Sequence, residues 1–345
     1  MHEKRFRIVY GMVIVLFLIL FSLWQVLVSM EESAVVRYRE AVYKINPVNY
    51  TYIYPTHTLP MGDYSRLIDL EEFYFQMMDN VCNDSSLFLL ILVHSAPGNF
   101  QKRKIIRDTW GQPREGLKVI FMLGETSDEI LAERLEKEND EYRDFAQGNF
   151  VDTYRNMTYK HVMVLKYVIY HCPQAKYILK TDDDAFVNIE TMLYFLKEDL
   201  SSNGVSDLLL CKVVQGANVF RSYRSKWRVS VKEFPERTYP TYCPGFAILY
   251  SPDIVFNLYR IAQNTNYFWI DDVHVTGTLA KQANVTHTDI SQFILEGKDL
   301  RCILDGQDSN KQYLYGPVNL NDNDIVALWN VVLRSENKKF RYFIR

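Results

Sequence analysis

Apolar residues gather in short continuous runs along this chain, and segments with a helical period separate the runs. Continuous apolar runs are typical of strands that are buried on both faces of a sheet. Three such runs cover residues 87–93, 117–123 and 177–180. Helices are predicted between them, from the loop at 94–98 to about residue 110, from a capping box at 126–129 to about residue 139, and over about 158–171.

Shorter elements are predicted around and after these: a strand at 149–152, a helix after Asn188, a strand at about 208–213 and an alternating, antiparallel strand at 227–234. Strands that alternate with helices predict an α/β fold with a mostly parallel sheet and helices on both faces. Ligands bind such sheets beyond the carboxyl ends of the strands. Two polar segments follow these ends, the loop at 94–98 and the triplet Asp182–Asp184.

The N-terminal region has a different texture. Residues 8–28 contain no charged side chain, and a helix of this length crosses a hydrocarbon core of about 30 Å. No small-residue cleavage site follows, so we interpret the segment as an uncleaved membrane anchor rather than a signal peptide or a buried core helix. The basic residues before it predict a cytoplasmic tail at 1–7. Residues 29–85 are expected to form a stem, and residues 86–345 one large α/β domain.

Four glycosylation sequons fit a lumenal body better than a cytosolic one. Sequons of the type N-x-[ST] begin at Asn49, Asn83, Asn156 and Asn284. The five cysteines include no C-x-x-C pair, which disfavours a structural zinc site. In an oxidising compartment they are expected to form one or two disulfides with a thiol left over, and their spacing leaves the pairing open.

Composition narrows the class of protein. The chain has 39 Lys+Arg against 42 Asp+Glu, a net charge of -3, and this balance lacks the basic surplus of nucleic-acid binders. No nucleic-acid partner is therefore expected. With 23% charged and 48% hydrophobic residues the chain is ordinary globular material. The 24 tyrosines and 20 phenylalanines suit a core or a sugar-stacking surface, and composition does not separate these uses.

The triplet Asp182–Asp184 is the sharpest chemical signal. Adjacent carboxylates repel one another, and a divalent cation such as Mg²⁺ or Mn²⁺, which prefers carboxylate and phosphate oxygens, offsets this repulsion. A D-x-D at a strand end therefore indicates a metal–diphosphate clamp. A solvated acidic turn is the alternative, and the apolar residues on both sides of the triplet disfavour it. A phosphohydrolase of the D-x-D-x-[TV] kind is disfavoured by Phe186.

Two other clusters carry candidate chemistry. Asp271 and Asp272 follow bulky aromatic residues, and such a pair supplies either a general base or a helix N-cap. Arg103 and Arg107 share a helix face four residues apart. With Trp110 they either hold a diphosphate and a flat ring or form an ordinary solvated basic face. The sequence has no P-loop, H-E-x-x-H or G-x-S-x-G motif.

Taken together, these segments resemble the β1,3-galactosyltransferase family, which includes β1,3-N-acetylglucosaminyltransferases. Five blocks follow one another in the family's order between about residues 87 and 280. They read LFLLILVHSAPGNFQKRKIIRDTWG, DTYRNMTYK, KTDDDAFV, YPTYCPG and DDV. Five blocks in order are far more specific than any one of them.

The resemblance implies a GT-A-like fold and a Golgi type II membrane enzyme whose catalytic domain, residues 86–345, is lumenal. It also implies a UDP-sugar donor, Mn²⁺, and inverting transfer to a glycoprotein or glycolipid hydroxyl in a β1,3 linkage. For single residues, the resemblance implies that Asp184 and Asp182 are metal ligands and that Asp272 is the base. The donor-binding residues that it implies are Asp182, Asp183, Arg103, Arg107 and Lys180.

The chain departs from the family pattern beside the base, which bears on acceptor fit. Asp271 replaces the Glu of E-D-V, His274 stands where Tyr is common, and Thr276 adds a residue before the next glycine. His287 is the nearest counterpart of a late histidine that completes the metal shell in some relatives.

Galactose is the favoured donor sugar, with UDP-N-acetylglucosamine and UDP-N-acetylgalactosamine as alternatives. A catalytically silent lumenal binding protein or chaperone on the same fold is the rival from another class. That rival predicts the loss of a key carboxylate, and both Asp184 and Asp272 are present.

Overall fold

A computed structural model describes the protein over residues 11–26, 46–78, 82, 86–306 and 312–342. The chain divides into two compact units, residues 1–45 and 46–345. The strands of the second unit are β1 Asn46–Pro47, β2 Phe75–Met78, β3 Leu89–His94, β4 Leu117–Glu125, β5 Phe145–Val151, β6 Tyr177–Asp182, β7 Val205–Ser206, β8 Leu209–Cys211, β9 Ile248–Tyr250 and β10 His287–Asp289.

An eight-stranded sheet forms the centre of this unit, in the order β10-β8-β9-β6-β3-β4-β5-β2. β3 pairs in parallel with β4 and β6, as do β4 with β5 and β10 with β8. β9 is antiparallel to both of its neighbours, and β2 is antiparallel to β5. The predicted mostly parallel α/β architecture is confirmed, and it fits a GT-A-like fold.

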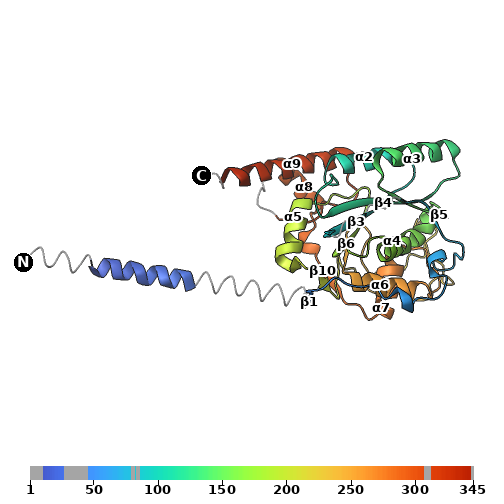
Figure 1. The fold of residues 1–345 in the computed structure, drawn as a ribbon, viewed down its shortest axis with the longest axis horizontal. Helices are drawn as coiled ribbons and strands as arrows, with labels where there is room; N and C mark the ends of the chain where they lie inside the picture. Colours follow the sequence, from blue (N-terminus) through green and yellow to red (C-terminus); the bar gives the residue numbers. More distant parts are fainter. Residues whose placement is uncertain (1–10, 27–45, 79–81, 83–85, 307–311, 343–345) are drawn as a thin grey trace, which may run out of the picture. The chain divides into compact units, whose positions relative to one another are not determined.

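Helices cover both faces of the sheet, as predicted. They are α2 Phe100–Asp108, α3 Glu129–Tyr142, α4 Met157–His171, α5 Ile189–Tyr194, α6 Pro252–Ala262, α7 Ala280–Gln282, α8 Gly297–Leu304 and α9 Asp322–Tyr342. Shorter turns are η1 Thr56–Thr58, η2 Asp63–Ser65, η3 Tyr154–Asn156 and η6 Ser291–Phe293, and η4 Phe195–Ser201 and η5 Asp272–Leu279 are π-helical. In Figure 1, α2, α3 and α9 lie on one face, and α4 and α6 lie on the other.

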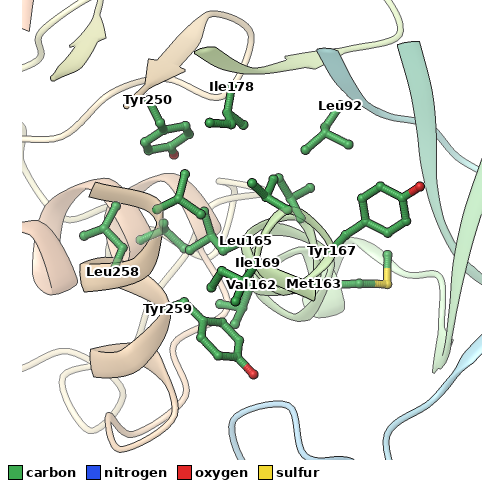
Figure 2. Packing of buried hydrophobic residues seen from close by; sticks show 14 of the residues in the cluster. Leu92, Val162, Met163, Leu165, Tyr167, Ile169, Ile178, Tyr250, Leu258 and Tyr259 are labelled. Carbon is green, nitrogen blue, oxygen red and sulfur yellow. The ribbon is translucent and has the colours of Figure 1, made fainter. Parts of the chain in front are cut away.

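The main core lies where α4 packs between the sheet and α6. Val162, Leu165 and Ile169, which the helical period places on one face, are all buried. Figure 2 shows them between Leu92 and Ile178 of the sheet and the side chains of α6. A helix buried on several sides is nearly apolar all round, and this is why the segment 161–169 contains few polar residues.

The predicted membrane anchor at 8–28 is described over residues 11–26, which form one helix. Within the described ranges, no helix is both long and apolar enough to cross a membrane. The predicted anchor is therefore not supported. Residues 8–10 and 27–28, and the predicted tail at 1–7, lie outside the described part.

The boundary between stem and domain also differs from the prediction. The second compact unit begins at Asn46 rather than at residue 86. Leu67, Ile68 and Phe73, which belong to the predicted stem, are buried in the body. Segment 46–78 lacks a sustained period because it packs as short turns, so its apolar residues do not follow a helical or strand pattern.

A buried polar network holds this segment. The carboxylate of Asp63 accepts hydrogen bonds from Tyr170 and Tyr259, each at 2.7 Å, and from Gln263 at 2.9 Å. Lys166 Nζ donates to the backbone oxygens of Asp63 at 2.6 Å and of Arg66 at 2.9 Å. Burial lowers the pKa of Lys166 to about 8. These partners are about a hundred or more residues apart in sequence, so no local pattern reveals them.

Two local predictions are corrected. Segment 227–234 is a loop rather than a strand, because Arg221 binds the backbone oxygens of Val229 and Phe234 that a strand partner would need. Helix α3 begins at Glu129 with Asp128 as its N-cap, so the predicted capping box at 126–129 does not form.

The predicted number of disulfides is confirmed. Cys82 pairs with Cys172 and Cys211 with Cys243, and Cys302 is a free, exposed thiol.

Candidate active site

The carboxyl ends of β3 and β6 meet at one edge of the sheet, as the sequence predicts. In the parallel register His94 lies opposite Asp182. The backbone N–H of Asp183 donates to the His94 oxygen at 3.1 Å. The loop after β3 and the aspartate triplet after β6 are therefore neighbours, although about ninety residues separate them in sequence.

The three aspartates do not share one environment. Asp183 is buried, and its carboxylate accepts hydrogen bonds from Ser95 at 2.7 Å, Asn99 at 2.8 Å and Lys102 at 3.2 Å. β6 ends at Asp182, and in the turn that follows the Asp183 side chain faces the loop after β3 and the start of α2. Its carboxylate is used inside the protein, and this position does not support the donor-binding role that the resemblance implies for it.

Asp182 and Asp184 keep accessible carboxylates, with side chains 34% and 38% exposed. Asp182 Oδ1 lies 2.8 Å from Lys180 Nζ, and Asp184 Oδ2 lies 3.9 Å from Lys102 Nζ. Burial, together with the charge of Asp182, raises the pKa of Asp184. Two nearby carboxylates repel each other when both are ionised. Their oxygens are ligands that a divalent cation prefers, so the pair fits such an ion.

Asp272 is the first residue of η5, and its carboxylate lies near Lys180. A Cβ added to Gly245 would meet Lys180 Nζ at 2.6 Å and Asp272 Oδ1 at 2.7 Å, so these two atoms flank the same glycine. Burial and then the charge of Asp271 raise the pKa of Asp272 well above its usual value. Burial acts to lower the pKa of Lys180, but Asp182, Asp271 and Asp272 raise it above its usual value, so this buried lysine stays charged.

His161 on α4 links Asp271 to the core. Its Nδ1 lies 3.1 Å from Asp271 Oδ2 and its Nε2 lies 2.9 Å from the Tyr250 hydroxyl. Burial lowers the pKa of His161, so its imidazole is neutral. Burial acts to raise the pKa of Asp271, but the hydrogen bond from His161 and the charge of Lys180 outweigh it and hold that pKa below its usual value. The ionised Asp271 only accepts, so Nδ1 donates to it and Nε2 accepts from Tyr250.

A second group of potential metal ligands lies here. His161, Asp271 and Asp272 each offer one ligand atom, and these atoms lie within 4.8 Å of one another. Both ring nitrogens of His161 already have hydrogen-bond partners. A metal at this point would displace one of them, whereas the side chains of Asp182 and Asp184 are about one third exposed.

Arg103 and Arg107 lie on the predicted helix, but their guanidinium groups point into the protein. Arg103 is fully buried, binds Glu138 at 2.7 Å and donates to the oxygens of Ala96 at 2.7 Å and Pro97 at 3.1 Å. Arg107 forms a two-point ion pair with Asp144 at 2.8 and 2.9 Å. These contacts fix the loop after β3 and the end of α3, and they do not support direct donor contact by either arginine.

The DTYRNMTYK block has a structural explanation. Lys160 is buried, lies 2.7 Å from Asp152 Oδ2 and donates to the Ser95 oxygen at 2.7 Å. Thr158 donates to the Phe268 oxygen at 2.6 Å. One short segment therefore ties the loop after β3 to the chain that leads into Asp271 and Asp272.

Sequence reasoning missed two residues of the site. Lys102 directly precedes Arg103, the residue that the sequence analysis names. It lies three residues after Asn99, and Asn99 and Lys102 both contact Asp183. Their i, i+3 spacing is the signal that could have found Lys102. His161 had no such signal, because its partner Asp271 is 110 residues away.

The remaining predicted residues are His287 and the sequon asparagines. His287 Nε2 is 2.6 Å from the Thr276 oxygen, so that nitrogen has a partner. Asn49 and Asn284 are exposed, and the Asn156 amide donates to the Val151 oxygen at 2.8 Å. Asn83 lies outside the described residues.

Comparison with known proteins matches the same part of the chain. The family model described as Galactosyltransferase matches residues 101–291, which include Lys180, the triplet and Asp272. Beta-1,3-galactosyltransferase 1 of Mus musculus is 32% identical over 222 residues, 63% of this chain and 68% of that protein. Beta-1,3-galactosyltransferase 5 of Homo sapiens is 31% identical over 216 residues, 61% of this chain and 68% of that protein. With a family match over more than half its length and relatives at this identity, the chain belongs to the galactosyltransferase family.

Proposed function

We propose that this protein transfers galactose from UDP-galactose to a hydroxyl of a glycan acceptor, forming a β1,3 linkage with inversion at the sugar carbon. The names of its relatives support the sugar and the linkage. The observation that carries the proposal is the arrangement around Lys180. This one buried cation contacts Asp182 of the triplet and flanks the same glycine as Asp272.

Asp184 and Asp182 would hold the metal, and Mn²⁺ is the ion we propose. Their partial exposure supports this choice because it leaves carboxylate oxygens within reach of an ion, and the raised pKa of Asp184 shows that this carboxylate gains from a nearby positive charge. When bound, a divalent cation neutralises charge on the departing diphosphate. Lys180 stays charged beside Asp182 and holds that carboxylate at a fixed place.

Asp272 is the general base in this proposal. Its raised pKa makes it a stronger proton acceptor than an ordinary aspartate, which suits removal of a proton from a sugar hydroxyl. Attack by that hydroxyl from the side opposite the diphosphate gives inversion. Lys180 contacts Asp182 and flanks Gly245 together with Asp272, so one buried lysine joins the proposed base to the carboxylates proposed for the metal.

Asp271 and His161 are positioning residues for this base. His161 is held by Tyr250 on one side and holds Asp271 on the other. Asp271 stays ionised, and its charge contributes to the raised pKa of Asp272. Asp271 is shorter than the Glu of the family pattern, and His161 contacts its carboxylate.

Other readings make different predictions. UDP-N-acetylglucosamine or UDP-N-acetylgalactosamine as donor would change the sugar and leave the carboxylate chemistry unchanged. A silent binding protein would have no need for a base with a raised pKa, and Asp272 argues against it.

We also propose that the protein works in the Golgi lumen. Two disulfides and the exposed sequon asparagines Asn49 and Asn284 support an oxidising, glycosylating compartment. Co-localisation with a Golgi marker and a mass shift on treatment with an N-glycosidase test this assignment.

A donor and acceptor screen tests the function. UDP release is measured with Mn²⁺ for the three UDP-sugars, each with acceptors that end in galactose, N-acetylglucosamine or N-acetylgalactosamine. We expect release with UDP-galactose and one class of acceptor. Asp272→Asn should lower kcat by about 10²–10⁴-fold and keep UDP binding, whereas Asp184→Ala should lose Mn²⁺-dependent UDP binding. Retained transfer by Asp272→Asn would refute the base.

A further inference from the structure

The loop from Val219 to Arg237, here called the basic loop, packs directly on the segment that leads into Asp271 and Asp272. Val219 and Val229 share a buried cluster with Phe268, Trp269 and Val273. Arg221 donates to three backbone oxygens of the loop, at 2.6 to 3.0 Å. The loop is therefore fixed in shape beside the proposed base.

A second set of contacts joins the basic loop to the site. Trp227 Nε1 donates to the Tyr154 hydroxyl at 2.6 Å, and the Tyr154 ring lies 5.9 Å from Trp269. Burial raises the pKa of Tyr154, and the charges of Asp271, Asp272 and Asp182 raise it further. Tyr154 thus lies within electrostatic reach of the site and contacts the loop on its other side.

The loop has a strong positive charge in a chain that is slightly acidic overall. Between Arg221 and Arg237 there are six basic and two acidic residues, against 39 and 42 in the whole chain. One of the two acids, Glu233, is already paired with Arg155 at 3.0 Å. Arg224, Lys226 and Lys232 are exposed, and none of them has a carboxylate partner among the described residues.

Exposed rings accompany these cations. Phe220, Tyr223 and Trp227 are 50%, 87% and 41% exposed. Lys226 Nζ lies 4.4 Å from the centre of the Trp227 ring, and the Arg228 guanidinium lies 3.8 Å from that of Tyr223. Flat exposed rings offer faces for sugars, and unpaired cations favour anions.

We propose that the basic loop binds the acceptor, and that this acceptor is an anionic glycan with a sulfate, phosphate or carboxylate group close to the sugar that is extended. The inference rests on the proposed function, since it places the acceptor hydroxyl at Asp272. Rings at Tyr223 and Trp227 contact sugar faces, while Lys226 and Lys232 attract the anionic group. A glycan rather than an acidic peptide is favoured, because the exposed rings alternate with the cations.

Binding of two matched oligosaccharides tests the proposal. Both have the same terminal sugar, and one has a sulfate ester on the next sugar. Calorimetry without donor gives the Kd of each, at low and at physiological ionic strength. We expect the sulfated glycan to bind about fivefold more tightly at low ionic strength, and we expect added salt to reduce this ratio because exposed charges are screened.

Two double variants that remove the same charge distinguish binding by the basic loop from general electrostatic attraction to the protein. Lys226→Ala/Lys232→Ala should bring the ratio of the two Kd values close to one. Lys137→Ala/Lys281→Ala, which removes two exposed lysines of other surfaces, should leave the ratio as in the wild type. Equal affinities in the wild type, or the same loss in both double variants, would overturn the proposal. An acidic peptide that competes as well as the sulfated glycan would overturn the glycan assignment.

Transfer assays distinguish the two levels of the argument. If the wild type galactosylates the neutral acceptor but binds both glycans equally, the proposal for the basic loop is wrong and the proposed function is retained. If the loop-dependent preference is present but no donor is transferred to either glycan, the proposed function fails and the binding surface stands.

Discussion

At the scale of single residues, Gly245 controls the distance between two charged groups. A Cβ there would come within 2.6 Å of Lys180 Nζ and 2.7 Å of Asp272 Oδ1, closer than real Cβ contacts. Gly245→Ala should therefore displace the base and the lysine that holds Asp182, and we expect kcat/KM to fall about 100-fold. The matched control is Gly297→Ala, where a Cβ meets no atom within 4 Å. A Gly245→Ala enzyme with wild-type kinetics would contradict this account.

The pKa of Asp272 gives a prediction for the pH profile. Asp272 must be deprotonated to accept a proton, so the acid limb of kcat/KM follows its raised pKa and activity increases as pH rises through it. Asp271→Asn removes a negative neighbour and keeps an oxygen that accepts from His161. We expect the pKa of Asp272 to fall, and the acid limb to move to lower pH by about one unit.

The corresponding control is Asp305→Asn, which changes one exposed carboxylate at the C-cap of α8. Its acid limb should match that of the wild type. A limb that stays in place in Asp271→Asn, or moves to higher pH, would show that Asp271 does not set the pKa of Asp272.

The residues of the site were predictable to different degrees. Asp182, Asp184 and Asp272 could be found because acidic clusters after apolar runs are a local signal. His161 could not be found, since only the fold brings it to Asp271. The role of Arg103 was also hidden, because its partner Glu138 lies on another helix, and spacing alone does not tell a buried guanidinium from an exposed one.

At the scale of elements, apolar runs predicted the central strands well, because strands buried on both faces leave a continuous signal. β3, β4 and β6 lie where the runs place them. The signal failed where contacts are between distant parts of the chain. Segment 46–78 has no local pattern and was therefore interpreted as a stem. It is held by contacts with distant residues, since Asp63 has its partners on α4 and α6. The alternating pattern at 227–234 arises from a loop that buries Val229.

The Asp63 network predicts how strongly segment 46–78 is held. Lys166→Met removes one donor from each of two backbone oxygens, and it takes away the positive charge that lies 4.0 Å from the buried Asp63 carboxylate. The low pKa of Lys166 means that its charge is costly to bury, but loss of one partner of a buried polar network costs about 3 kcal/mol or more. We expect urea unfolding to show this decrease in the free energy of unfolding, and Lys137→Met on the exposed face of α3 to change it little. A loss below about 1 kcal/mol would contradict the prediction.

At the scale of the whole molecule, the two disulfides differ in the length of chain that they close. Cys82 and Cys172 are 90 residues apart, and Cys211 and Cys243 are 32 apart. The entropy of the unfolded chain makes the longer loop worth about 4–5 kcal/mol and the shorter about 3–4 kcal/mol. Replacing Cys82 and Cys172 by serine should therefore lower stability more than replacing Cys211 and Cys243.

The order should reverse for activity. The backbone N–H of Cys243 donates to Thr276 Oγ1 at 2.9 Å, and that hydroxyl donates to the backbone oxygen of Asp272 at 2.6 Å. The Cys211–Cys243 bond thus anchors both η5 and the segment that leads to Gly245, whereas Cys82–Cys172 joins the segment before β3 to the end of α4. Chemical denaturation and kcat/KM, measured on both serine pairs at a temperature where each is folded, test this reversal. If the pair that loses more stability also loses more activity, then the disulfides act only on the fold, and the path from Cys243 through Thr276 does not position the base.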